Sequence, residues 1–143
     1  MISVTRKYNF SASHRLHVDS FSEAKNDEVF GKCNHPYGHG HNYELLVTAR
    51  GPVDAESGLA VDTQKLDRLV SERVLRTFHL KNMNTDIAAF QKTVPTTENV
   101  GIEIRRAIRE GWKEAFPGDW PVFEKLRIYE TERNIFEVSN EKA

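Results

Sequence analysis

Two strand-like segments near the start of the chain constrain the fold more than any other feature. Polar and apolar residues broadly alternate over residues 2–10, and a second strand-like segment covers residues 42–51. Alternation with a period of two predicts β-strands. If these strands pair as an antiparallel hairpin, His14 lies just past the end of the first, and His39 and His41 lie just before the second. The three imidazoles then converge at one end of the hairpin.

A metal site is one interpretation of these three histidines. Side chains alternate along an extended segment, so the rings of His39 and His41 point to the same side. With His14 as a third ligand, the set suits zinc, which in catalytic sites takes three protein ligands and keeps a fourth position open. An isolated His-x-His pair also occurs in ordinary surface sequence. We assign the nearby His17 and His35 to loop or supporting roles.

The only cysteine of the chain, Cys33, lies in the Gly- and Pro-containing loop before the second strand. A thiol close to a metal is a candidate acid or base, and the alternative is a buried structural thiol. A single cysteine forms no internal disulfide, which fits a reducing compartment and predicts a cytoplasmic protein.

Composition narrows the class of protein. A length of 143 residues predicts one domain over residues 1–143, and the net charge of -1 argues against a nucleic-acid or membrane-surface partner. No apolar run approaches the roughly 20 residues of a membrane span, and the N-terminus carries no apolar signal segment. We therefore expect a globular protein that binds neither nucleic acid nor membrane.

The remaining pattern predicts two helices and two further strands. Apolar residues recur at helical spacing over residues 66–75, behind Asp62 or Thr63 as N-cap. A second helix follows the start signal Thr96-Thr97-Glu98 and runs to residue 112. Residues 123–130 and 135–138 predict strands, whereas residues 19–32 predict a surface loop with one helical turn.

The element order is therefore β-β-α-α-β-β. Two hairpins and two helices predict an α+β fold, with a four-stranded antiparallel sheet covered by the helices on one face. An open sheet of this size exposes its edge strands, and proteins usually cover such edges. We therefore expect a homo-oligomer that pairs strand edges.

Motifs along nearly the whole chain resemble those of the 6-pyruvoyl-tetrahydropterin synthases. They include FSASHRL at residues 10–16, FGKCN at 30–34, GHGHNY at 38–43, TTENV at 96–100 and YET at 129–131, with Pro36 and the pair Lys81-Asn82. Five residues separate the cysteine from His-Gly-His. The related 6-carboxytetrahydropterin synthases usually have a shorter gap and resemble the chain less closely.

The resemblance implies the tunnelling fold, in which three subunits close their sheets into a barrel and two trimers stack into a hexamer. Active sites of that family lie at subunit interfaces. The implied reaction converts 7,8-dihydroneopterin triphosphate into 6-pyruvoyl-tetrahydropterin, releases triphosphate and needs no external electron carrier.

The resemblance also implies roles for residues. Zinc would bind His14, His39 and His41, and act as a Lewis acid. Cys33 would accept a proton as a thiolate, with a nearby cation or metal lowering its pKa. Glu130 would be catalytic by anchoring the pterin, and the remaining substrate-binding residues would be Thr96, Thr97 and Glu98. Arg15 and Lys32 are weaker candidates for holding the triphosphate.

One position departs from the family pattern. The synthases carry Asp-His before Lys-Asn, and this pair supports the cysteine in proton transfer, but the chain has His79-Leu80 there. Leucine cannot relay a proton. Either His79 is the catalytic substitute, or it only caps the end of the preceding helix.

This departure leaves three functions open. The first is a working pterin synthase that uses Cys33 and His79. The second is a zinc enzyme on the same substrate with another outcome, either side-chain cleavage of the aldolase kind or the 6-carboxytetrahydropterin reaction. The third is a non-catalytic pterin-binding protein, although such a protein would need no thiol.

Overall fold

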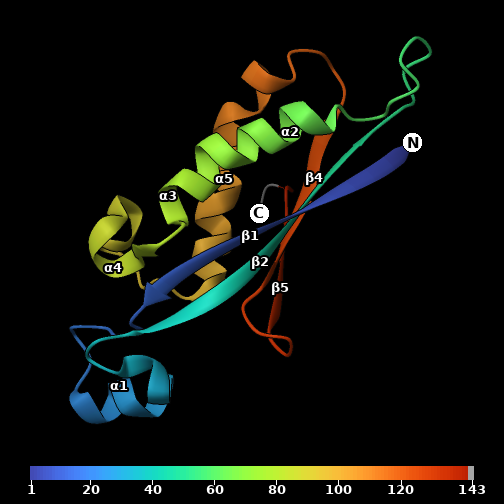
Figure 1. Cartoon of the computed structure of the whole chain (residues 1–143). Helices are drawn as coiled ribbons and strands as arrows, with labels where there is room; N and C mark the ends of the chain where they lie inside the picture. Colours follow the sequence, from blue (N-terminus) through green and yellow to red (C-terminus); the bar gives the residue numbers. More distant parts are fainter. Residues whose placement is uncertain (142–143) are drawn as a thin grey trace.

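The computed structural model of the chain describes residues 1–141 and confirms the α+β class (Figure 1). Its elements are β1 (Ile2–His14), α1 (Glu23–Phe30), β2 (His39–Gly51), α2 (Thr63–Val70), α3 (Arg76–Phe78), β3 (Lys81–Asn82), α4 (Met83–Asp86), α5 (Thr97–Ala115), β4 (Val122–Tyr129) and β5 (Ile135–Ser139). Short 3₁₀ turns cover Gly31–Asn34 and Ala88–Phe90, and a π-helical turn, Ser71–Leu75, joins α2 to α3.

Five strands form the sheet, in the order β3-β1-β2-β4-β5. The four predicted strands are present and pair antiparallel, and the short β3 adds a fifth, parallel to β1. This strand forms because the chain turns back after α3, where the Leu80 N–H donates to the Ser11 carbonyl oxygen at 2.6 Å. Two residues of pairing carry little hydrophobic pattern, so the alternation of the sequence did not predict it.

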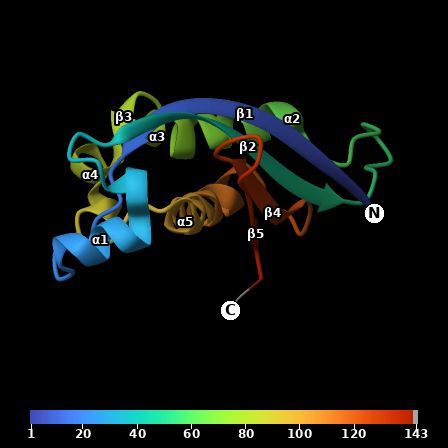
Figure 2. The ribbon, with the colours of Figure 1, turned by 90° about the horizontal axis from the view of Figure 1, so that it is seen from below.

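The hairpin of β1 and β2 is longer than the sequence pattern predicts. Its register runs from Ile2 opposite Gly51 to His14 opposite His39, so the histidines lie inside the strands and not just beyond them. Figure 2 shows the two strands side by side as an arched ribbon, with α5 beneath it and α1 at the end opposite the N-terminus. The arch ends where the three histidines meet.

One face of the sheet forms the core with α2 and α5. Alternate residues of β2, from Tyr43 to Ala49, are buried on this face. In β4, Phe123 and Leu126 both reach the core, although strict alternation would place them on opposite faces. A register shift opposite Thr48 and Ala49 explains this, because an extra residue in one strand moves the following side chains to the other face.

Helix α1 (Glu23–Phe30) is longer than predicted, because the sequence indicated a surface loop with one helical turn over residues 19–32. Ser22 caps the helix by accepting a hydrogen bond from the Lys25 N–H at 3.1 Å. Its one buried residue is polar: the Asn26 amide bonds both the N–H and the carbonyl oxygen of Val18. A helix held by an asparagine has no apolar stripe, so its periodicity could not predict it.

The predicted starts of the two main helices are confirmed. Asp62 accepts hydrogen bonds from two backbone N–H groups in the first turn of α2, and Thr96 accepts one from Asn99 at the start of α5. Over the described residues, neither these helices nor any other combine the length and the apolar character that crossing a membrane requires.

Candidate metal centre and adjoining pocket

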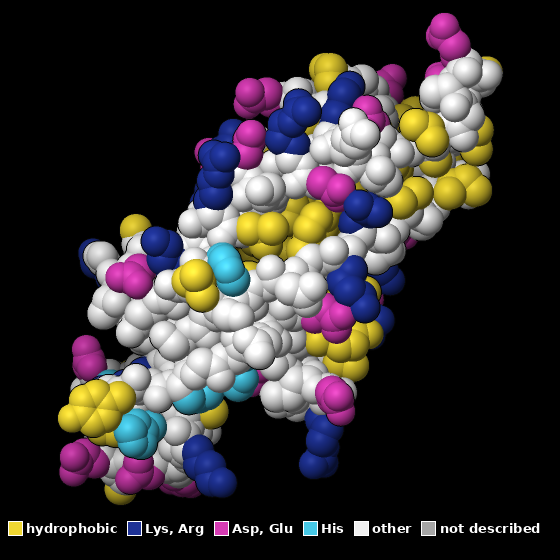
Figure 3. All heavy atoms as spheres, viewed as in Figure 1, with side chains coloured by type: hydrophobic (Ala, Val, Ile, Leu, Met, Phe, Trp, Pro, Cys, Tyr) yellow, Lys and Arg dark blue, Asp and Glu magenta, His cyan; other side chains and the backbone are white. Residues whose placement is uncertain are grey.

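The hairpin brings His14, His39 and His41 together as predicted. One nitrogen from each ring can be chosen so that the three lie within 4.8 Å of one another, and the ring centroids are 4.6–5.1 Å apart. His14 lies directly opposite His39 in the register, and His41 follows two residues later on the same face. Figure 3 shows histidine side chains near the end of the molecule that carries α1.

The donor chemistry of this cluster fits a metal ion. His14 is 1% exposed, and its Nδ1 lies 2.8 Å from the Pro95 carbonyl oxygen, which only accepts hydrogen bonds. The ring must therefore donate from Nδ1 and present the lone pair of Nε2. The Nε2 atoms of His14 and His41 are buried and have no hydrogen-bond partner among the described residues. Two buried, unpartnered nitrogens in one cluster of rings are what a bound cation would satisfy.

Burial favours the neutral form of two of the candidate ligands, His14 and His39. It lowers the pKa of His14, where the Pro95 contact opposes the shift, and it lowers the pKa of His39. The neighbouring His41 lowers the pKa of His39 further. Neutral imidazole is the form that binds a metal.

Gly38 allows the loop to approach His14 closely. Its φ of +69° is a left-handed conformation, and a Cβ atom there would lie 2.8 Å from the His14 carbonyl oxygen. Only glycine accepts both conditions without a shift of the backbone. This residue therefore lets β2 begin at His39, directly beside His14.

Glu130 lies next to the histidine cluster at the end of β4. Its Oε1 is 3.6 Å from His41 Nε2, and its Oε2 accepts a hydrogen bond from the buried Thr97 hydroxyl in the first turn of α5. The side chain is 15% exposed. Of the other predicted substrate-binding residues, Thr96 caps α5 and Glu98 is exposed on its first turn.

Tyr43 lies beneath the cluster, two residues after His41. Its ring makes edge contacts with His41 and His14 and stacks on Phe10 at 4.9 Å. Burial raises the pKa of Tyr43, the Glu130 carboxylate raises it further, and the nearby Thr97 hydroxyl opposes the rise. The phenol therefore keeps its proton and remains a hydrogen-bond donor.

Cys33 opens onto a pocket of about 880 Å³ that also reaches His39. Arg15 and Lys32, the candidates for a triphosphate, line the same pocket. Burial raises the pKa of the Cys33 thiol, and the Glu130 carboxylate raises it further. This is opposite to the direction expected from a neighbouring cation, and an added positive charge would favour the thiolate.

Asn34 holds the turn that carries Cys33. Its side-chain oxygen lies 2.7 Å from His17 Nδ1 and accepts from an Arg15 Nη at 3.2 Å, while its amide donates to Asp27 at 3.0 Å. The Arg15 Nε donates to the Asn34 carbonyl oxygen. The sequence suggested that the Arg15 guanidinium holds a triphosphate. In the structure its N–H groups donate to Asn34 and so position the turn that carries Cys33.

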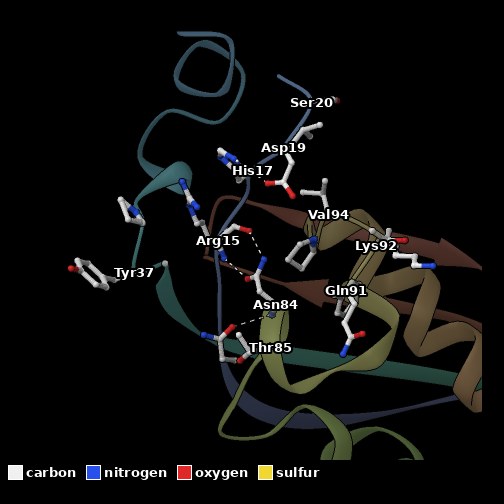
Figure 4. Close-up of a pocket in the computed structure, with 17 residues that line it drawn as sticks. Arg15, His17, Asp19, Ser20, Tyr37, Asn84, Thr85, Gln91, Lys92 and Val94 are labelled. Atoms are coloured by element: carbon white, nitrogen blue, oxygen red, sulfur yellow. Dashed lines mark hydrogen bonds and ion pairs between the residues drawn. The ribbon is translucent and has the colours of Figure 1, made fainter. Parts of the chain in front are cut away.

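Asn84 fixes the backbone of Arg15 from the other side. The Arg15 N–H donates to the Asn84 side-chain oxygen at 2.7 Å, and the Asn84 amide donates back to the Arg15 carbonyl oxygen at 3.0 Å (Figure 4). The same close-up shows Lys92 across a second pocket, of about 520 Å³, which Pro95 also lines. Asn84 thus ties the segment after β3 to the residue that follows His14.

No hydrogen bond joins His79 to Cys33 within the described part of one chain. Its Nδ1 accepts a hydrogen bond from the Ser11 N–H at 3.1 Å, and its backbone N–H ends the preceding helix on the Leu75 carbonyl oxygen. Leu80 follows in a left-handed conformation, with a φ of 60°, and is 77% exposed. The geometry within one chain is that of a capping residue beside an exposed leucine.

Sequence reasoning missed Pro95, Asn34 and Asn84 as supports of the site. Pro95 acts through a carbonyl oxygen that every residue has, so no side-chain signal exists for it. Asn34 is the last residue of the FGKCN motif and follows Cys33 directly. This position was the one sequence feature that could have indicated its role in holding the turn.

Known proteins that are similar to this chain include several 6-pyruvoyl tetrahydrobiopterin synthases. The family model described as 6-pyruvoyl tetrahydropterin synthase matches residues 3–141. The chain is 39% identical to the 6-pyruvoyl tetrahydrobiopterin synthase of Poecilia reticulata over 92% of its own length and 86% of that protein. It is 37% identical to the human protein of that name, over 92% and 87% of the two chains.

A solved structure shares this fold. The structure of Caenorhabditis elegans 6-pyruvoyl tetrahydropterin synthase superposes with a TM-score of 0.87 and 40% identity, covering 98% of this chain and 96% of that one. The match confirms that the α+β architecture is the tunnelling type expected from the motifs.

Proposed function

The chain belongs to the 6-pyruvoyl tetrahydropterin synthase family, and from this premise we propose that it is a zinc-dependent lyase acting on 7,8-dihydroneopterin triphosphate. The products would be 6-pyruvoyl-tetrahydropterin and triphosphate, a carbon-oxygen elimination from a phosphate ester. The observation that carries the proposal is the Glu130 carboxylate, held by Thr97 at 3.6 Å from His41 of the histidine cluster.

Glu130 would recognise the pterin ring. The amino group and ring N–H of a pterin form a planar donor edge, and a carboxylate pairs with such an edge through two parallel hydrogen bonds. The Thr97 hydroxyl occupies one lone pair of Oε2 and so fixes the plane of the carboxylate. A ring bound in this way would extend its side chain towards the histidines.

The histidine cluster and Cys33 would act on the pterin side chain. Zinc held by His14, His39 and His41 would supply a Lewis acid to the side-chain oxygens. Cys33 would accept a carbon-bound proton, which requires its thiolate form. Because burial and Glu130 raise the pKa of Cys33, pairing of Glu130 with a donor edge would remove part of the opposing charge.

The assembly and location proposed here follow from the exposed edges and the family. The outer edge of β1 is paired only at Ala12 and Ser13, which leaves most of that strand open to pairing. We propose that one domain per subunit forms a trimer or a hexamer of two trimers, in the cytoplasm. Such an assembly would also cover Leu80 and give Cys33 neighbours from another subunit.

A second candidate function rests on Leu80. This residue stands where family synthases carry the relay histidine, and the His79 ring is engaged by Ser11. A chain without that relay would convert the same pterin to another product, by side-chain cleavage or by the 6-carboxytetrahydropterin reaction, or it would bind the pterin without turnover.

The test is to incubate the zinc-loaded protein with 7,8-dihydroneopterin triphosphate and identify the products by mass. Pyruvoyl product with free triphosphate supports the synthase. A shortened or carboxylated side chain supports the related enzymes, and saturable binding without turnover supports the pterin-binding protein. Glu130→Gln is the matched control, because it keeps the shape of Glu130 but loses the charge that recognises the donor edge.

Two variants locate the proton relay. General acid–base groups contribute about 10²–10⁴-fold to rate. If His79 serves the relay, His79→Ala lowers turnover within that range and Leu80→His changes it little. If the relay is broken, Leu80→His raises turnover and His79→Ala leaves it unchanged.

A further inference from the structure

The Tyr43 hydroxyl is the one buried phenol group in the described chain that lacks a hydrogen-bond partner. Tyr43 has no exposed surface, and its buried OH makes no hydrogen bond within 3.5 Å among the described residues, although the Thr97 hydroxyl lies near enough to affect its pKa. An unpartnered polar group in a core costs free energy, and a phenylalanine would fill the same space without that cost. The hydroxyl therefore points to a hydrogen bond that forms in another state of the protein.

The position of Tyr43 identifies the group it would meet. Glu44 pairs with Tyr129 at the end of the register of β2 and β4, Tyr43 precedes Glu44 in β2, and Glu130 directly follows the end of β4. Tyr43 lies in the core, and Glu130 Oε1 is 3.6 Å from Nε2 of His41, whose ring contacts the ring of Tyr43. The Thr97 hydroxyl, which donates to Glu130, is also close to the phenol.

We propose that Tyr43 is a positioning residue for the pterin anchor, whose hydroxyl donates to Thr97 Oγ1 when pterin engages Glu130. This inference rests on the proposed function and deepens it. Thr97 Oγ1 already gives its hydrogen to Glu130, and its lone pairs remain free to accept. The result is a chain of hydrogen bonds from Tyr43 through Thr97 to the carboxylate.

Such a chain would strengthen the anchor without touching the ligand. Each hydrogen bond in a series polarises the next, so donation by the phenol makes Thr97 a better donor to Glu130. The carboxylate is then held in one plane, which favours the two parallel bonds to a pterin edge. Tyr43 would thus contribute to the affinity for the pterin ring, whereas Cys33 would carry out the chemistry on the side chain of the pterin.

The test compares two tyrosines that differ in whether the hydroxyl has a partner. The Tyr8 hydroxyl donates to Asp67 at 2.7 Å, away from the histidine cluster, and serves as the control. Thermal unfolding without added pterin is measured for Tyr43→Phe and Tyr8→Phe, together with the dissociation constant of the zinc-loaded protein for 7,8-dihydroneopterin by fluorescence titration.

The two variants should behave in opposite ways. Tyr43→Phe should unfold at the same or a higher temperature and bind the pterin about tenfold more weakly. Tyr8→Phe should unfold at a lower temperature and bind as the parent does. In a Thr97→Val background, Tyr43→Phe should cause no further loss of affinity, because the phenol acts through Thr97.

Three results would overturn the inference. If the parent binds pterin and Tyr43→Phe binds it equally well, the Tyr43 hydroxyl does not contribute to pterin affinity. A fall in unfolding temperature as large as that of Tyr8→Phe would show that the phenol already has a partner in the protein alone. Failure of the parent itself to bind pterin would remove the proposed function, and this inference with it.

Discussion

The Nδ1 atom of His14 lies 2.8 Å from the backbone carbonyl oxygen of Pro95, on the segment that leads into α5. A backbone carbonyl only accepts, so this contact selects the tautomer with its lone pair on Nε2, in a ring whose centroid is 4.8 Å from that of His39 and 5.1 Å from that of His41. The segment that leads into α5 therefore orients the His14 ring of β1 for metal binding. In the first turn of the same helix, the Thr97 hydroxyl donates a hydrogen bond to Glu130.

Zinc binding should depend on all three histidines of the cluster. We expect one zinc per chain after dialysis, measured by elemental analysis. Loss of an inner ligand should weaken binding by more than the roughly 10–100-fold that loss of a supporting residue costs, so His14→Ala should retain no stoichiometric zinc. The control His35→Ala removes an exposed imidazole from the same loop and should keep one zinc. Full zinc occupancy in His14→Ala would contradict the assignment.

Gly38 and Gly58 offer a matched pair for the geometry of the site. Both have a positive φ, but a Cβ at Gly58 meets nothing within 4 Å, whereas one at Gly38 meets the His14 carbonyl oxygen at 2.8 Å. Gly58→Ala should lower the free energy of unfolding by about 1–2 kcal/mol, the cost of a left-handed alanine. Gly38→Ala should cost more and should also weaken zinc binding. Equal effects in urea unfolding and equal zinc affinity would show that the close approach is unimportant.

The histidine cluster could be predicted because strand pairing follows from local pattern. Alternation places His39 and His41 on one side, and antiparallel pairing of β1 with β2 places His14 opposite His39. Glu130 was assigned through family resemblance, since its position beside His41 depends on how β4 pairs with β2. The fold class followed from the order of elements for the same reason: the four long strands and the two main helices each have their own periodicity.

The rest of the site could not be predicted because it depends on polar contacts between distant segments. Asn34 binds Arg15 and His17, and Asn84 binds the backbone of Arg15, without any periodic signal. The orientation of His79 depends on the two-residue strand β3, which is too short to leave a pattern. Such contacts follow from the packed fold, so the roles of these residues emerged only from the structure.

The ion pair between Arg6 and Asp67 predicts a pH dependence of stability. The Arg6 guanidinium donates to Asp67 and holds the pKa of that carboxyl below its usual value, with help from Tyr8. A carboxyl whose pKa is lowered by folding contributes stability that is present above about pH 4 and is lost as the pH falls further. The pair is partly exposed, so Asp67→Asn should lower the free energy of unfolding by about 0.5–1 kcal/mol at pH 7.

Urea unfolding at neutral and acid pH checks this prediction. The difference between the parent and Asp67→Asn should shrink as the pH falls below 4, because the parent then loses the charge as well. Asp119→Asn, at an exposed position near the end of α5, is the control. A difference that stays constant down to pH 2 would show that the lost stability does not come from ionised Asp67.

Alkylation of Cys33 should report whether Asn34 holds its turn in place. Cys33 is the only cysteine, so iodoacetamide labelling followed by mass reads this residue alone. Burial is the main cause of the raised pKa of Cys33, and the thiolate is the form that reacts. Asn34→Ala removes the contacts to Arg15, His17 and Asp27, so the thiol should become more exposed and its pKa should fall towards the usual value. Labelling at pH 7.5 should become several-fold faster, and the pH midpoint of the rate should move down.

Asn140→Ala is the matched control, because that amide bonds the Phe123 carbonyl oxygen at the other end of the sheet. It should lower the unfolding temperature without changing the rate or the pH midpoint of labelling. Equal acceleration in both variants would mean that general loosening exposes the thiol. Acceleration in Asn34→Ala alone means that the network around Arg15 sets the environment of Cys33, and the same network joins that turn to His14 and to the segment after Leu80.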